Sequence, residues 1–513
     1  MRRRFWAAGL TALLAAAGLA TTAVLLGQPG YRLHGSAGPG EASDRLTVSI
    51  MQPMYDRKPQ RSEVWDLLEN KFNIRYEPVS IPAASYSTKL MMAVSSGKPP
   101  DIVLWTSFMS ELINFIESGL FHDLTPYIGN SANLKTAIPQ RIWNRVELNG
   151  SYYGIPRPRA EVDQAVMIRK DWLEALRLPV PETIDDYYNT AVKFGQSDPD
   201  GNGRKDTYGF AAGEGLNFLH NLLPAFGAGN SWILRSDGSL EASKVSPERE
   251  SGLLWLRKLY AERGIDQSFS SLQQSQVWDR FTSGKTGIIV APIADYERFR
   301  ARLASANPRA ELLMLGPPVG PEGISGFGER PGYYGLFLIP KRVPEEKVKR
   351  IVELLDWQSG EEANRIRKFG LEGVHHTVKE DRTLQINRES LQVEDLGSLL
   401  LMNPYDPYYY VSTSAPEYVQ EKQRTMLDLV RDKGIPNPAE GFMPNTGLSV
   451  ASIYTKKIQR FETDFVKGNV PVQDFAWFRR EWLDRGGKEA TQEVNEWYRT
   501  YRSNGEQGRR DGG

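Results

Sequence analysis

Residues 46–118 alternate between strand patterns and amphipathic helix patterns, and this alternation constrains the fold more than any other feature of the chain. Each short run suited to a strand is followed by a helical stretch with one apolar face. Such an alternation builds a parallel sheet with helices on its faces. The chain is therefore expected to begin with an α/β lobe. Strands are predicted at 46–50, 73–79 and 101–105, and helices at 62–72, 86–96 and 108–118.

The pattern changes after residue 160, where helices dominate and strand patterns return only at intervals. A chain that leaves one lobe and later returns to it forms discontinuous lobes. The two or three crossovers between such lobes can act as a hinge over a central cleft. We expect an N-terminal α/β lobe at 46–157 and 288–345 and a helix-rich C-terminal lobe at 158–287 and 346–502. The tail at 503–513 is expected to be disordered.

The N-terminal segment is typical of an export signal. Three arginines precede an uncharged run at 5–26, and a stretch rich in Gly, Pro and Ser follows at 27–44. The uncharged run is also long enough to span a bilayer. We expect residues 1–45 to be an export signal or an uncleaved membrane anchor, followed by a flexible tether. Either role places the folded chain at the extracellular face of the cytoplasmic membrane, anchored or released.

Composition excludes several classes of function. The 63 basic and 63 acidic residues cancel, so no net field favours nucleic acid as a partner. The chain has no cysteine, which excludes disulfides, zinc–thiolate sites, a cysteine nucleophile and lipid attachment at a lipobox cysteine. Its 513 residues, with 12 Trp, 22 Tyr and 20 Phe, are sufficient for two or three domains with large cores.

A polar loop after the helix expected at 183–195 has the spacing of a calcium-binding loop. Oxygen-bearing side chains occupy positions 1, 3, 5 and 9 of such a loop. Gly203 stands at position 6, where the backbone must turn sharply. The expected Ca²⁺ ligands are Asp198, Asp200, Asn202, the carbonyl of Arg204, and Asp206.

This loop differs from an EF-hand at its end. Position 12 is Gly209 instead of a bidentate Glu, and the residues that follow do not have a helical pattern. The spacing therefore predicts a structural calcium clip between a helix and a strand, and not a sensor that opens a groove. The alternative is a polar turn closed by hydrogen bonds from its own Asp and Asn side chains.

Six blocks between residues 148 and 375 resemble the bacterial extracellular solute-binding proteins that deliver oligosaccharides to ABC importers, and the resemblance is expected to extend over roughly residues 46–500. The blocks are LNGSYYGIPRPR (148–159), MIRKDWL (167–173), LPVPET (178–183), the loop at 198–209, GPPVGPEG (316–323) and FGLEGVH (369–375). The resemblance implies a two-lobed, periplasmic-binding-protein-like α/β fold with a hinge and a central cleft. It also implies an oligosaccharide ligand, an ABC permease as partner, a monomer, and a calcium site in the second lobe.

Members of this family are typically lipoproteins, whereas this chain lacks the lipobox cysteine. A membrane-tethered sensor subunit that binds a sugar and signals to a kinase is therefore an alternative to an importer component. In either case the protein contacts the cell membrane through its N-terminal segment. The expected action is the same: the lobes close on an oligosaccharide, and the closed form is presented to a partner.

A sugar-binding cleft needs aromatic faces that stack on pyranose rings and polar groups that bind the hydroxyls. Trp105 ends a predicted strand at the edge where ligands bind in open α/β sheets, although it could equally be a core residue. Trp232 follows a glycine-containing loop, and Tyr334 precedes a strand expected near the hinge. Tyr405 belongs to an aromatic stretch at 403–410, of which one or two rings are expected to face the cleft.

Arg157 and Arg159 flank prolines near the first expected crossover. A guanidinium group in a cleft would favour acidic sugars, because it grips a carboxylate with two hydrogen bonds. Uronate-containing ligands are therefore a hypothesis, and two solvated loop arginines are the alternative.

Catalysis finds little support in the sequence. His375 and His376 lack the spacing of a zinc site, and Asp185 and Asp186 are explained by a helix start. The chain contains neither a G-x-S-x-G motif nor a Walker A motif. A polysaccharide-degrading enzyme would require paired carboxylates in the cleft. We therefore expect a binding protein and not an enzyme.

Overall fold

The computed structural model describes residues 45–510 except 56–57, 107–108, 381–382, 413–414, 441 and 443. The expected export signal or anchor, apart from Arg45, lies outside these residues. Within the described ranges, no helix combines the length and the apolar character needed to cross a membrane. Residues 503–510, expected to be disordered, instead continue helix α19 (Lys488–Arg510).

The first lobe is built on a five-stranded sheet with the order β2-β1-β3-β12-β4. β1 runs parallel to both β2 and β3, as the alternation predicts. β12 lies antiparallel between β3 and β4. The strands are β1 (Leu46–Met54), β2 (Ile74–Pro82), β3 (Ile102–Trp105), β4 (Gly154–Pro158) and β12 (Tyr333–Leu338).

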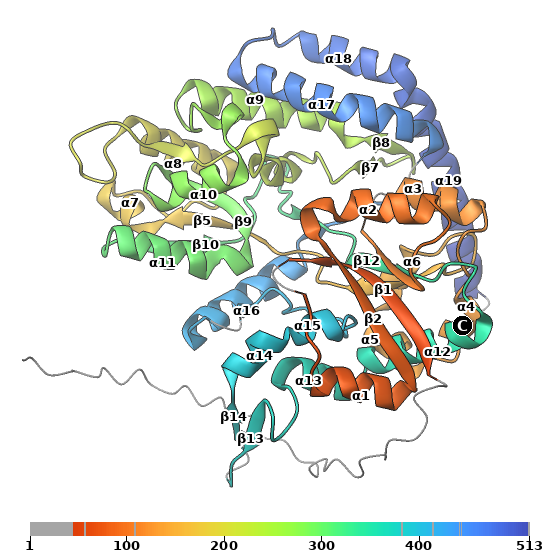
Figure 1. Ribbon diagram of the computed structural model, residues 1–513. Helices are drawn as coiled ribbons and strands as arrows, with labels where there is room; N and C mark the ends of the chain where they lie inside the picture. The colour runs from red at the N-terminus through yellow and green to blue at the C-terminus, as the bar shows by residue number, and fades with distance from the viewer. Residues whose placement is uncertain are drawn as a thin grey trace, which may run out of the picture.

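The second lobe is built on a four-stranded sheet with the order β10-β5-β9-β6. Its central strands β5 and β9 are antiparallel, with Val166 opposite Val290. Both are buried along nearly their whole length, so each packs on two faces. The strands are β5 (Gln164–Arg169), β6 (Tyr208–Phe210), β9 (Thr286–Pro292) and β10 (Leu312–Leu315). Figure 1 shows the two sheets in separate halves of the molecule.

Helices divide between the two cores. Those with side chains in the first core are α1 (Glu63–Phe72), α2 (Ala83–Ser95), α3 (Met109–Glu117), α4 (Thr125–Ile128), α5 (Ala132–Ala137), α6 (Gln140–Asn144), α12 (Glu345–Ser359), α13 (Glu361–Phe369) and α15 (Leu396–Leu399). Those with side chains in the second are α7 (Lys170–Ala175), α8 (Ile184–Gln196), α9 (Pro247–Ala261), α10 (Gln274–Thr282), α11 (Tyr296–Ala306), α16 (Glu417–Arg431), α17 (Asn445–Lys467) and α18 (Asp474–Trp482). The short helix α14 (Arg388–Glu394) precedes α15.

Three small pairs of strands complete the described structure. β7 (Trp232–Leu234) and β8 (Leu240–Ala242) form a hairpin, as do β13 (His376–Val378) and β14 (Leu384–Ile386). β11 (Phe327–Gly328) pairs in parallel with β15 (Gly434–Ile435).

Two predicted helix starts are confirmed by their caps. The Ser62 side chain accepts a hydrogen bond from the Trp65 backbone at the start of α1. At α8, the Asp186 backbone N–H donates to Thr183 Oγ1 (3.1 Å), and the Thr183 N–H donates to the Asp186 carboxylate (2.9 Å). This reciprocal pair satisfies two donors that the helix itself leaves free.

The lobes divide the chain differently from the expected ranges. β9 and β10 belong to the second sheet, although 288–345 was expected in the first lobe. Conversely, α12 and the segment ending at Met402 pack into the first core, although 346–502 was expected in the second lobe. For β9 the reason is physical: a strand buried on both faces is apolar throughout, so its pattern does not reveal which sheet it joins.

Three crossovers connect the lobes. The first lies between β4, which ends at Pro158, and β5, which begins at Gln164. The second enters β12 at Tyr333, and the third runs from Met402 in the first core to Val411 in the second. The expectation of two or three crossovers is therefore confirmed.

Candidate functional site

A cavity of about 900 Å³ lies where the three crossovers meet the first lobe. The ends of β1, β3 and β4 border it on one side, and α13, α14 and α15 contribute further lining residues. Its aromatic lining residues are Tyr55, Tyr333, Tyr334, Tyr409 and Tyr410. Its charged lining residues are Arg157, Arg159, Arg330, Arg367, Lys368 and Asp395.

Arg159 is buried, with only 8% of its surface exposed, and contacts all three crossovers. Its backbone N–H donates to the carbonyl of Gly332 on the second crossover (2.8 Å). Its side chain donates to Asn403 Oδ1 on the third (2.8 Å) and to the carbonyl of Pro158 (2.7 Å). The guanidinium group also lies 4.0 Å from the centre of the Tyr409 ring.

Arg157 and Arg367 lie in the same cavity. The Arg157 guanidinium lies 5.7 Å from the Tyr334 ring, at the distance that Arg159 also keeps from this ring. Its Nε is buried and has no hydrogen-bond partner in the structure. Arg367 donates to the carbonyl of Met402 and to Asn364 Oδ1.

These three arginines have lowered pKa values. Burial, reinforced by the positive charge of Arg159, lowers the pKa of Arg157 to about 10. Burial also lowers the pKa of Arg367 to about 10, and it lowers the pKa of Arg159 below its ordinary value. In each case burial holds a cation out of water, which disfavours the charged form. For Arg157 and Arg367 the positive charge of Arg159 adds to this effect.

The other charged lining residues have opposite-charge or hydrogen-bonding partners. Arg330 Nε donates to Asp163 at 2.9 Å, and Lys368 lies 3.8 Å from Asp406. Asp395, the one carboxylate among the lining residues, accepts a hydrogen bond from Ser398. In the described part of the chain, by contrast, no ion pair joins Arg157, Arg159 or Arg367 to a carboxylate. The chain is neutral as a whole, but this cavity is strongly cationic.

The structure brings three of the six predicted ligand-binding residues into this cavity: Arg157, Arg159 and Tyr334. Tyr405 lies instead in a neighbouring cavity of about 290 Å³, where its hydroxyl donates to Glu161 Oε2 at 2.7 Å. Trp105 is a core residue with 2% of its surface exposed, and its ring packs against Phe115. A side chain so deeply buried has no face to offer a ligand.

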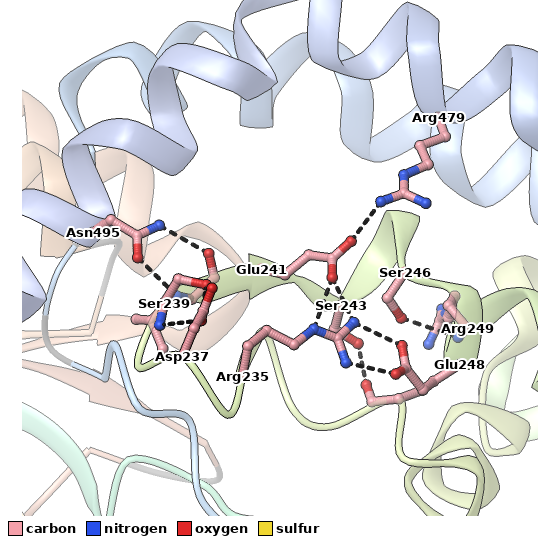
Figure 2. A network of polar contacts seen from close by, with 12 residues as sticks. Arg235, Asp237, Ser239, Glu241, Ser243, Ser246, Glu248, Arg249, Arg479 and Asn495 are labelled. Carbon is pink, nitrogen blue, oxygen red and sulfur yellow. Dashed lines mark hydrogen bonds and ion pairs between the residues drawn. The ribbon is translucent and has the colours of Figure 1, made fainter.

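Trp232 also lies away from the cavity, packed between the β7–β8 hairpin and the C-terminal helices. A polar network fixes this hairpin (Figure 2). Arg235 donates to Glu241 at 2.8 Å and to Glu248 at 2.6 Å, and Arg479 of α18 donates to Glu241 at 2.8 Å. The loop position of Trp232 suggested a binding role, but the loop is held within the second lobe.

Sequence reasoning missed Arg367 and Tyr55 as lining residues. Arg367 lies on an ordinary amphipathic helix, and no local pattern distinguishes it from solvated arginines. The aromatic stretch at 403–410 was a usable signal, because two of its rings, Tyr409 and Tyr410, line the cavity. The histidines His375 and His376 are both buried.

The loop at 198–209 connects α8 to β6, which confirms the helix–loop–strand order. Gly203 has a φ of 81°, as the sharp turn requires. Asp198 accepts hydrogen bonds from the backbone of Asn202 (3.1 Å) and Gly203 (2.8 Å), and Asp206 binds Lys285 at 2.7 Å.

The donor types of this loop fit Ca²⁺, which binds carboxylate, amide and carbonyl oxygens. The side chains are not arranged around a common ion position, because the described residues include no group of three or more His, Cys, Asp or Glu side chains placed to hold a metal ion. As folded, the carboxylates are satisfied by the loop's own N–H groups and by Lys285.

Comparison with known proteins places this geometry in context. The family model of bacterial extracellular solute-binding proteins matches residues 56–365. Two Bacillus subtilis proteins are similar over nearly their full lengths. The lipoprotein LipO is 26% identical, with 91% of this chain and 95% of LipO covered. The polygalacturonan/rhamnogalacturonan-binding protein YtcQ is 25% identical, with 93% of this chain and 96% of YtcQ covered.

Solved structures with the same fold support the two-lobed architecture. A solute-binding protein from Bifidobacterium longum infantis that binds HMO superposes with a TM-score of 0.71 at 15% identity, covering 89% of this chain and 99% of that one. An EF-hand mutant of the Streptococcus pneumoniae ABC-transporter substrate-binding protein FusA, bound to fructo-nystose, superposes with a TM-score of 0.66 at 18% identity. The match covers 89% of this chain and 100% of that one. The alginate-binding protein AlgQ2 without calcium ion superposes with a TM-score of 0.65 at 18% identity, and the match covers 89% of this chain and 98% of that one.

Proposed function

Because the chain belongs to the family of bacterial extracellular solute-binding proteins, we propose that it captures an oligosaccharide in the cavity where its crossovers meet the first lobe and delivers it to an ABC importer. The observation that carries this proposal is the cavity of about 900 Å³ at the crossovers, lined by tyrosines and by hydrogen-bond donors. Its size is near the upper end of the range for small-molecule sites. YtcQ and FusA, whose names include a polysaccharide ligand and an ABC transporter respectively, support the same reading.

The lining chemistry suits a saccharide. Tyrosine rings offer flat apolar faces to pyranose rings, and guanidinium groups donate several hydrogen bonds to hydroxyls. Hydrolysis of a glycosidic bond would need a pair of carboxylates across the bond. Among the described residues that line the cavity, Asp395 is the sole carboxylate. The cavity therefore favours binding over cleavage.

The crossovers supply the means of closure. The residues that line the cavity come from the first lobe and from the crossovers, and within the described chain none comes from the sheet of the second lobe. A ligand held on the first lobe would gain further contacts if the second lobe rotated over it about the crossovers. The closed pair of lobe faces would then be the surface that the permease recognises.

We also propose a structural Ca²⁺ in the loop at 198–209, held by Asp198, Asp200, Asn202, Asp206 and the carbonyl of Arg204. The donor set and the glycine turn support it, as do relatives whose solved structures concern a calcium ion or an EF-hand. Bound there, the ion would brace α8 against β6. The N-terminal segment would export the chain and either anchor it to the membrane or be removed.

Binding of saccharides to the purified folded chain, residues 45–510, tests the proposal. Calorimetric titration with neutral and acidic oligosaccharides of two to six sugar units should find at least one that binds and raises the melting temperature. Incubation with the same ligand should release no shortened sugar. If no saccharide binds, or if the bound sugar is cleaved, the proposal is wrong.

A further inference from the structure

We infer that the cavity selects saccharides that carry a carboxylate group, with Arg157, Arg159 and Arg367 as the groups that bind it. This inference rests on the proposed function, because it assumes that the cavity holds a sugar. It goes further by naming the chemical class of the ligand and the residues that would recognise its charge.

The charges that line the cavity are not balanced. Five cations and one carboxylate line the cavity, although the whole chain is neutral. Two of the five, Arg330 and Lys368, face Asp163 and Asp406. Arg159 and Arg367 donate hydrogen bonds to neutral groups, and Arg157 lies beside an aromatic ring. Asp406 attracts Arg367 electrostatically without forming an ion pair with it. The described residues therefore leave most of the positive charge of these three arginines uncompensated.

Burial makes this imbalance of charge more costly. Arg159 is 8% exposed, and the buried Nε of Arg157 has no hydrogen-bond partner. Buried cations without counterions are costly, and proteins normally pair them. A guanidinium group matches a planar carboxylate with two parallel hydrogen bonds. A carboxylate entering the cavity would therefore satisfy groups that the folded chain leaves unsatisfied.

Two tyrosine rings indicate which kind of molecule would carry the carboxylate. Tyr334 lies beside both Arg157 and Arg159, with each guanidinium 5.7 Å from its ring, and Tyr409 lies against Arg159 at 4.0 Å. A small inorganic anion would use the arginines alone. A uronic acid residue has a ring for the tyrosine face and a carboxylate for the guanidinium groups. The juxtaposition thus fits an acidic sugar better than a free anion.

The decisive experiment compares ligands that differ only in this charge. Trigalacturonate, the corresponding neutral trigalactoside, a sulfated trigalactoside and inorganic phosphate are titrated into the protein at pH 7 and low salt. We expect trigalacturonate to bind at least ten-fold more tightly than the neutral trisaccharide. We also expect its affinity to fall as the pH is lowered through about 4, where a carboxylate becomes protonated. Tighter binding of the sulfated sugar or of phosphate would overturn the choice of a carboxylate.

Variants then test the named residues. Arg157→Gln and Arg367→Gln should each weaken binding of trigalacturonate about ten- to a hundred-fold, as expected for the loss of hydrogen bonds between charged groups. Lys368→Gln is the matched control: it removes one charge from the same cavity, but from a half-exposed ammonium that faces Asp406. We expect it to change the affinity less than three-fold. An equal loss in all three variants would indicate a diffuse field and would refute specific recognition.

The outcomes separate this inference from the proposed function. If a neutral oligosaccharide binds as tightly as its acidic counterpart, the protein is a sugar-binding protein but the charge inference fails. If no saccharide of either kind binds, the proposed function itself fails. Circular dichroism and melting curves of each variant confirm that a loss of binding does not reflect a loss of folding.

Discussion

Replacement of Arg157 by methionine should stabilise the ligand-free protein while it weakens ligand binding. The pKa of Arg157 falls from the ordinary value of 12.5 to about 10 because the side chain is buried beside Arg159. This fall corresponds to roughly 3 kcal/mol against the charged form at neutral pH, since each pKa unit equals about 1.4 kcal/mol. Methionine keeps most of the aliphatic stem and removes the charge.

We expect a net gain of about 1–2 kcal/mol in the free energy of unfolding, because imperfect packing of the new side chain offsets part of the benefit. In a lobe of this size, such a gain raises the melting temperature by a few degrees. Differential scanning calorimetry of the ligand-free protein measures it. The same variant should lose most of the melting shift that an acidic oligosaccharide gives the unchanged protein.

Arg330→Met is the matched control, because Arg330 lines the same cavity but pairs with Asp163 at 2.9 Å. Its removal leaves the buried Asp163 carboxylate without this partner, so the same substitution should destabilise the protein. The two substitutions should therefore change the melting temperature in opposite directions. If both lower it by similar amounts, other groups or water molecules compensate the charge of Arg157, and the expected stabilisation is refuted.

Three further predictions concern the second lobe. Saturating Ca²⁺ should raise the melting temperature, and excess chelator should reverse this rise. The Asp198→Ala variant should lose both effects and still bind ligand. An identical melting curve with and without chelator would contradict a bound ion. Glu462→Gln should lower the free energy of unfolding by about 3 kcal/mol, because it leaves the mostly buried Arg249 without its carboxylate partner (2.7 Å). Although burial opposes ionisation of Glu462, Arg249 and His220 hold its pKa at about 2. The stabilising effect of its carboxylate is therefore complete above pH 4.5 and is lost as the pH falls through 2. Denaturation curves between pH 2 and 6 should show this loss in the unchanged protein and not in the Glu462→Gln variant. Thr183→Ala should lower the free energy of unfolding by about 1 kcal/mol through the loss of the α8 cap, and Thr183→Ser, measured in parallel by urea denaturation, should retain most of it.

Local patterns predicted the parts of the fold that depend on local physics. The β-α-β-α-β-α start, the cap at Thr183 and the turn at Gly203 each follow from residues close together in the sequence. The membership of β9 did not, because a strand that is apolar on both faces fits either sheet. The site was predictable only in part for a similar reason. Arg157 and Tyr334 stood out near expected crossovers, but the arrival of Arg367 from α13 depends on how distant segments pack.

Arg159 lies where the proposed ligand cavity meets the crossovers. It follows β4 directly, its backbone binds Gly332 of the second crossover, and its side chain binds Asn403 of the third. A carboxylate that binds its guanidinium group therefore acts on the point where all three crossovers meet. A ligand shifts a conformational equilibrium only through contacts that differ between the two states. If lobe closure carries the crossovers toward the ligand, neutralising Arg159 removes the repulsion from Arg157 and Arg367 that opposes their approach. An acidic sugar would then promote closure more strongly than a neutral sugar of equal affinity, and small-angle scattering with each ligand at saturation should show the larger decrease in radius of gyration for the acidic one.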